Sequence, residues 1–266
     1  MTQMTRTRLT LLVTLALALL RAPLAAAMQA LLPDLAQAPM TNYAAMIAQS
    51  ILLFALPGCL LMPAWRTQRR MPRESWMWAL LALGLAALTR AASTPLNAWW
   101  AEKLGAPGSL LPRAEGPLET ALQLLAVAVI PAASEEVFFR GALLTNLLQR
   151  GSRAQALLLT TAMFALMHGS LPGLPGHLLI SLVLTLLMLC SERLCVPVLA
   201  HMAYNLLALA GIALPAWTAW LAFGLLLAAL AWLLTHLPEG RARCLPGWEW
   251  ALCGLTLVAM AAQYLL

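Results

Sequence analysis

The chain alternates long apolar runs with short polar connections. Several runs approach the roughly 20 residues that an α-helix needs to cross about 30 Å of hydrocarbon. The alternation of apolar and polar residues that a transmembrane β-strand would show is weak, which argues against a barrel. The pattern predicts an all-α fold, a polytopic transmembrane helical bundle of about 8–9 spans. The runs lie near residues 9–32, 43–62, 76–94, 118–149, 154–170, 174–190, 196–213, 216–236 and 248–266.

Three of these runs depart from a simple span. Arg90 interrupts the run at 76–94. The run at 118–149 would be about 48 Å long as a helix, so we expect it to tilt, to break near Pro131 or to project from the membrane. The run at 9–32 follows Arg6 and Arg8 and contains three consecutive alanines, which also fits a secretory signal peptide. We favour a first membrane span at residues 1–32 and keep the signal peptide as the alternative.

Composition and charge support a membrane location. Hydrophobic residues make up 62% of the chain and charged residues 10%, against about 25% charged in soluble domains. The net charge of +6 comes from scattered arginines, which favours topology signals over a nucleic-acid surface. If the N-terminus is cytoplasmic, Lys103 and Arg113 are the only two of these basic loop residues on the opposite side of the membrane. The residues on the cytoplasmic side are then Arg6, Arg8, Arg66, Arg69, Arg70, Arg73, Arg150, Arg153, Arg193, Arg241 and Arg243.

The chain shows no internal repeat and no separate soluble segment. We therefore expect one integral membrane domain over residues 1–266, in a bacterial inner membrane, with a core of interest at 118–213. The five cysteines include no Cys-x-x-Cys pair, so neither a zinc knuckle nor a disulfide framework is indicated.

The segment Ser134–Arg140 places two carboxylates and a guanidinium inside an apolar run. Ionisable residues within membrane spans are costly and point to function by default. Glu136 and Arg140 are four residues apart and share a helix face, whereas Glu135 is turned about 100° away. Glu136 can be neutralised locally, and Glu135 needs a partner from another helix. The alternative is an inert ion-pair network.

Two further spans each carry a pair of side chains one helical turn apart. Phe164 and His168 form the first pair, and His201 and Asn205 the second. Alone, each histidine also fits a buried structural residue or a polar clamp between helices. Together with Glu135 they supply what peptide hydrolysis requires, which is a held water, a base and donors for an oxyanion. The site is expected within the membrane, between the helices at 118–149, 154–170 and 196–213.

Residue counting from the cytoplasmic helix ends tests whether these side chains share a level. At about 1.5 Å per residue, Glu135 and His168 both lie about 21 Å deep, whereas His201 lies about 9 Å and Asn205 about 15 Å deep. The third pair is therefore predicted to be too shallow unless a helix tilts or begins beyond the membrane face.

The three motifs together resemble the CPBP family of intramembrane proteases. This family includes the Rce1-type CAAX prenyl endopeptidases and bacterial Abi or bacteriocin-processing relatives. The match consists of Glu-Glu-x-x-x-Arg at 135–140, Phe-x-x-x-His at 164–168 and His-x-x-x-Asn at 201–205. The resemblance implies a glutamate-dependent endopeptidase acting on a peptide or protein substrate that is membrane-bound and, in eukaryotic relatives, lipidated. It implies that Glu135 and His168 activate water and that His201 and Asn205 form the oxyanion site, with Glu136, Arg140 and Phe164 supporting.

Alternatives remain for the cofactor, the class of protein and one histidine. The family was first described as metal-dependent, but the sequence has no His-Glu-x-x-His and no separate set of zinc ligands, so we favour a reaction without a cofactor and keep zinc as the alternative. A transporter or a non-catalytic immunity or binding scaffold would use the same polar cluster. His177 begins a span beside Pro-Gly turns and is interpreted as interfacial, with a cavity-facing position as the alternative.

Overall fold

The computed structural model describes residues 2–31, 39–63, 75–106, 114–212, 215–238 and 244–264. Within these ranges every regular element is helical and no strand occurs, which confirms the all-α class. The elements are α1 (Gln3–Leu31), α2 (Pro39–Ser50), η1 (Ile51–Ala55), α3 (Leu56–Leu61), α4 (Ser75–Lys103), α5 (Pro117–Gln123), η3 (Leu124–Val129), α6 (Ile130–Glu136), η4 (Val137–Leu144), α7 (Thr145–Arg150), α8 (Arg153–Met167), α9 (Leu174–Ser191), α10 (Cys195–Ala210), α11 (Ala216–Thr235) and α12 (Gly247–Ala262).

Consecutive elements join into longer rods. The elements α2, η1 and α3 follow one another without a break, as do the five elements from α5 to α7. In the part of the chain that the structure describes, each predicted apolar run therefore corresponds to one helical rod. The largest difference in bounds is at 76–94, because α4 continues through Pro95 to Lys103.

Five helical segments of the described residues are long and apolar enough to cross a membrane, and three further apolar helices are shorter. These segments support an integral membrane protein, while the count of 8–9 spans and the cytoplasmic N-terminus stay predictions. Several of the arginines on which the predicted orientation was based lie outside the described residues, namely Arg66, Arg69, Arg70, Arg73, Arg113, Arg241 and Arg243. The five segments are Thr41–Leu61, Trp76–Lys103, Pro117–Arg150, Leu174–Ser191 and Trp217–Thr235.

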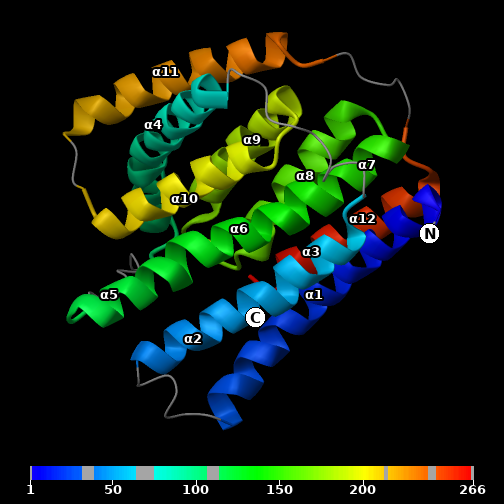
Figure 1. Ribbon diagram of the computed structural model, residues 1–266, viewed down its shortest axis with the longest axis horizontal. Helices are drawn as coiled ribbons and strands as arrows, with labels where there is room; N and C mark the ends of the chain where they lie inside the picture. The colour runs from blue at the N-terminus through cyan, green and yellow to red at the C-terminus, as the bar shows by residue number, and fades with distance from the viewer. Residues whose placement is uncertain are drawn as a thin grey trace.

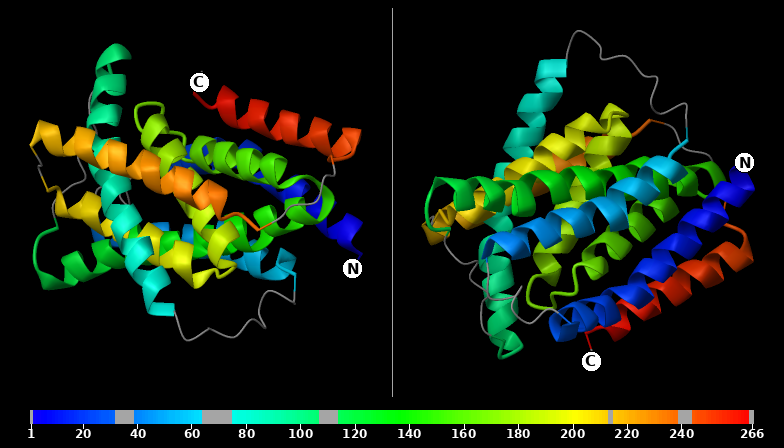
Figure 2. Two further views of the ribbon diagram at one scale, coloured as in Figure 1. Left: turned by 90° about the horizontal axis from the view of Figure 1, so that it is seen from above. Right: turned by 60° about the horizontal axis from the view of Figure 1, so that its bottom comes forward.

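The rod from α5 to α7 lies in the middle of the molecule (Figure 1). The α2–α3 rod packs along one side of it, and α9 and α10 pack along another. Helix α4 crosses α9, α10 and α11 (Figure 2), and α1 and α12 pair with each other against α7 and α8. The central rod thus contacts the helices that carry both predicted histidine motifs.

The central rod stays helical throughout because its turns widen. The π-helical segments η3 and η4 flank α6, which carries Glu135 and Glu136. Pro131 lies in the first turn of α6, where η3 ends, and the rod continues through it, so of the three alternatives for this run the break near Pro131 does not occur. A wider turn shifts the carbonyl that a proline ring would otherwise meet. π-Helical widening occurs frequently at functional sites, which fits the position of η3 and η4 beside the two glutamates.

Close backbone packing fixes the α2–α3 rod against the central rod. A Cβ atom at Gly58 would lie 2.8 Å from the backbone nitrogen of Phe138 and 2.8 Å from Cγ1 of Val137. Nearby, the Asn146 side-chain amide donates to the Leu61 carbonyl at 3.1 Å. Lipid gives helices little hydrophobic reason to associate, so small residues and polar clamps of this kind carry the packing.

Replacing Gly58 by alanine is expected to lower the thermal stability of the purified protein by about 1–3 kcal/mol, because the added methyl group forces the two rods apart. Thermal unfolding in detergent measures the effect. Gly84→Ala in α4 is the matched control, since a Cβ atom there would meet nothing within 4 Å. Equal stability of the two variants would show that the Gly58 contact is dispensable.

Candidate active site

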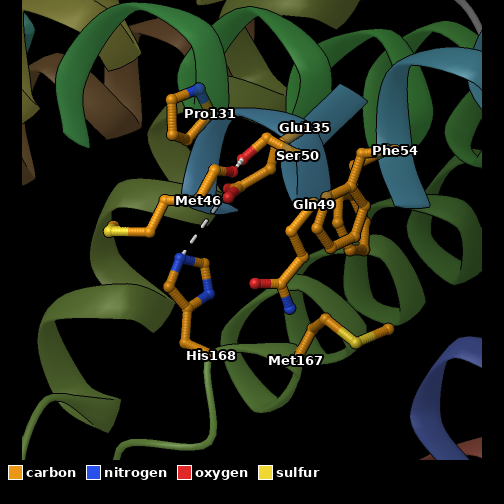
Figure 3. A pocket seen from close by; sticks show the side chains of 9 residues that line it. Met46, Gln49, Ser50, Phe54, Pro131, Glu135, Met167 and His168 are labelled. Atoms are coloured by element: carbon orange, nitrogen blue, oxygen red, sulfur yellow. Dashed lines mark hydrogen bonds and ion pairs between the residues drawn. The ribbon is translucent and has the colours of Figure 1, made fainter. Parts of the chain in front are cut away.

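Glu135 and His168 face each other across a cavity, as Figure 3 shows. The Glu135 Oε2 and His168 Nε2 atoms are 3.8 Å apart, and their side chains are 15% and 26% exposed. This separation is longer than a hydrogen bond and is one that a water molecule can bridge. The cavity has a volume of about 240 Å³. Its other lining residues are Met46, Gln49, Ser50, Phe54, Pro131, Phe139 and Met167.

The local structure of α8 sets the orientation of His168. A reciprocal capping pair of Ser152 and Gln155 starts the helix, and Gly169, with φ of 61°, follows His168 at its end. The His168 Nδ1 atom lies 2.8 Å from the Phe164 carbonyl oxygen, one of the last-turn carbonyls that an α-helix leaves unpaired. Because a carbonyl only accepts, Nδ1 carries the proton. In the neutral ring Nε2 is then an acceptor directed toward Glu135.

Glu136 faces away from this cavity's lining and forms a buried triad with Arg140 and His201. Its Oε1 atom accepts from Arg140 Nη1 at 2.8 Å and lies 3.0 Å from His201 Nδ1. Glu136 and Arg140 are fully buried. Arg140 also donates to the Ser181 hydroxyl at 2.9 Å, and its guanidinium lies 4.3 Å from the centre of the Phe164 ring. The expected pairing of Glu136 with Arg140 is present, so the two glutamates have different surroundings.

The contact with Glu136 corrects the depth predicted for His201. Residue counting put His201 closer to the cytoplasmic face than the glutamates, but a separation of 3.0 Å places its ring beside Glu136. The counting assumed straight, parallel helices that all begin at one membrane face. Since α10 has only 16 residues, its first residue need not lie at that face.

Asn205 and His201 are arranged differently from the first pair. The Asn205 amide donates to the Val127 carbonyl of η3 at 3.2 Å, and neither side chain lines the cavity of Glu135 and His168. The Phe164 ring connects the two groups, because its centre lies 4.7 Å from the His168 ring and 5.6 Å from the His201 ring. The structure therefore brings Glu135 to His168 and His201 to Glu136, with Phe164 in contact with both imidazoles.

Three further residues of the site were missed or placed elsewhere from sequence. Gln49 and Ser50 of α2 line the cavity, and two adjacent polar residues in the apolar run 43–62 were the available signal. The His177 ring stacks on the His168 ring at 4.1 Å with an interplanar angle of 26°, so it contacts a site residue without itself being among the residues that line the cavity. Among the described residues, no group of three or more His, Cys, Asp and Glu side chains is arranged to hold a metal ion.

Fold and site together define a helical membrane protein with a carboxylate and an imidazole facing one cavity inside the helix bundle. Residues 117–207 match the family of type II CAAX prenyl endopeptidase Rce1-like proteins. This segment contains all three motifs and confirms the resemblance that they indicated. No curated protein and no solved structure matches the chain. The match supports a membrane endopeptidase. The substrate and the mechanism are taken up as proposals below.

Proposed function

We propose that the protein is an intramembrane endopeptidase that cleaves a membrane-associated peptide with water activated by Glu135 and His168. The observation that carries the proposal is the separation of 3.8 Å between the carboxylate and the imidazole in one cavity. A water molecule between them can donate one hydrogen to each group, because Nε2 of neutral His168 is an acceptor. General-base catalysis of this kind needs both groups within hydrogen-bond reach of the water.

In the proposed reaction Glu135 takes a proton from the water molecule. The oxygen of that water molecule bonds to the carbonyl carbon of the substrate at the same time. The tetrahedral intermediate carries negative charge on the former carbonyl oxygen. When the C–N bond breaks, Glu135 returns the proton to the leaving amine. The two proton transfers cancel, so the carboxylate is regenerated at each turnover.

His201 and Asn205 are the proposed donors to the oxyanion on the basis of the family resemblance; they do not line the cavity of Glu135 and His168, and the Phe164 ring, which contacts both imidazoles, connects the two groups. Because the Glu136 carboxylate accepts from Nδ1 of His201, Nε2 can donate only when the ring is doubly protonated. The Arg140–Glu136–His201 triad would then carry one net positive charge, which would attract the negative charge that develops on the substrate oxygen. Asn205 uses one amide hydrogen on Val127 and retains the second for the substrate.

The proposed substrate class can be tested with the reconstituted protein. The assay uses a peptide that ends in a prenylated cysteine followed by three residues, and the same peptide without the prenyl group, with products identified by mass spectrometry. Release of the last three residues supports the proposal, and the two peptides show whether lipidation is needed. If the folded protein cleaves neither of them, this substrate class is excluded, and a failure to cleave other membrane-associated peptides as well would favour the non-catalytic transporter or scaffold.

Chelation is expected to leave the activity within about twofold of the untreated enzyme, because Glu135 and His168 can activate water without a Lewis acid. The measurement compares the initial cleavage rate before and after dialysis against a zinc chelator, with a known zinc protease treated in parallel. Loss of activity that added zinc restores would replace this mechanism with a metal-dependent one and would leave the endopeptidase proposal intact.

A further inference from the structure

We propose that His177 is a positioning residue, which holds the His168 imidazole in the orientation that water activation requires. The proposal rests on the proposed function for its kinetic consequence, but its structural basis does not. The ring centres of His168 and His177 are 4.1 Å apart and the planes differ by 26°. The two rings therefore lie nearly parallel and in direct face-to-face contact.

His168 needs such support because of where it lies. It occupies the C-terminal cap of α8, and its side chain is 26% exposed to the cavity. The hydrogen bond from Nδ1 to the Phe164 carbonyl fixes one edge of the ring. The Phe164 ring touches the imidazole at 4.7 Å and a tilt of 52°. The stacked His177 ring supplies a second aromatic contact and restricts rotation of the imidazole away from Glu135.

Contacts in the turn between α8 and α9 place the His177 ring against the His168 ring. A Cβ atom at Gly173 would lie 2.8 Å from Cε1 of His177, so the ring packs directly on the glycine backbone. The Asn97 side chain accepts from the Gly176 backbone N–H at 2.8 Å and occupies the space next to it. Trp100 donates to the Leu171 carbonyl at 3.0 Å. Helix α4 thereby anchors both the turn and the first residues of α9.

The contact that supports His168 is made by the flat face of the His177 ring. A phenylalanine at position 177 keeps a flat ring at the same place, whereas alanine removes it. We expect His177→Ala to lower kcat about 10-fold with KM within about twofold, because small misplacements of catalytic groups slow the reaction without weakening binding. His177→Phe should stay within about threefold of wild type, since the aromatic contact is kept.

A direct measurement on His168 makes the test independent of proteolysis. The chain contains four histidines, so protein labelled with ¹⁵N in its histidines gives signals that single variants can assign. We expect wild-type His168 to show the tautomer with the proton on Nδ1, as its bond to Phe164 requires. His177→Ala should shift these signals toward the average of two tautomers, and His177→Phe should preserve the wild-type pattern.

His236→Ala is the matched control. The His236 ring contacts the Trp232 ring at the end of α11, with ring centres 4.2 Å apart and a tilt of 31°, and it does not line the cavity, so its loss should leave the His168 signals and kcat unchanged. Thermal unfolding of each variant separates a local effect from a loss of folding. An unchanged His168 tautomer in His177→Ala, or a His177→Phe variant as impaired as His177→Ala, would overturn the proposal. Absence of peptidase activity in wild type would instead count against the proposed function, while the tautomer still decides the role of His177.

Discussion

Replacing Glu135 by glutamine is expected to lower kcat by about 10³-fold, within the range that general-base catalysis contributes, while the protein stays folded. Glutamine keeps the shape of the side chain but cannot accept the proton of the attacking water. Glu135 lies outside the buried triad around Glu136 and faces a cavity, so the change removes no packing contact of the core. His168→Ala should also lower kcat, by about 10²-fold, because it removes the second group that orients the water.

The measurement is the single-turnover cleavage rate of the prenylated peptide by equal amounts of folded wild type and variant. Glu102→Gln provides the control, since Glu102 is an exposed glutamate near the end of α4. A Glu135→Gln variant that retains more than about a tenth of the wild-type rate would show that another group takes the proton. A variant with normal binding and no cleavage would also be suited to trapping natural substrates.

The features that sequence predicted well depend on short-range geometry. The apolar runs gave each helical rod of the described residues, because helix length is tied to the thickness of the hydrocarbon. The pairing of Glu136 with Arg140 follows from a spacing of four residues within one helix. The three motifs together pointed to the family that residues 117–207 match. None of these inferences required knowledge of which helices are neighbours.

The features that sequence missed depend on how the rods pack. His201 and Glu136 are 65 residues apart in the chain and touch only because α10 packs on α6. The stack of His177 on His168 depends on the turn that α4 anchors. The wider turns of η3 and η4 also escaped prediction, since an apolar run looks the same in an α-helix and in a π-helix. The packing of the helical rods therefore determines the parts of the site that residue counting misplaced.

Breaking the buried triad is expected to destabilise the protein strongly. Glu136→Gln leaves the Arg140 charge without its carboxylate, and Arg140→Met leaves the Glu136 carboxylate without its guanidinium. Both side chains are fully buried, and removal of one partner from such a pair typically costs about 3–5 kcal/mol. Unfolding in mixed detergent micelles measures the loss, with Glu102→Gln again as the exposed control.

The double variant Glu136→Gln/Arg140→Met separates stability from catalysis. With both charges removed, no uncompensated charge stays buried, so the loss of stability should be smaller than the sum of the two single losses by about 1 kcal/mol or more. Its cleavage rate should nevertheless stay low, because the neutral amide at position 136 is a weaker acceptor for the Nδ1–H of His201 than the carboxylate and holds this proposed oxyanion donor less firmly. Recovery of both stability and activity would restrict the triad to packing and would leave Asn205 as the proposed oxyanion donor. Recovery of stability alone would show that these two buried charges contribute to the chemistry as well as to the stability of the protein.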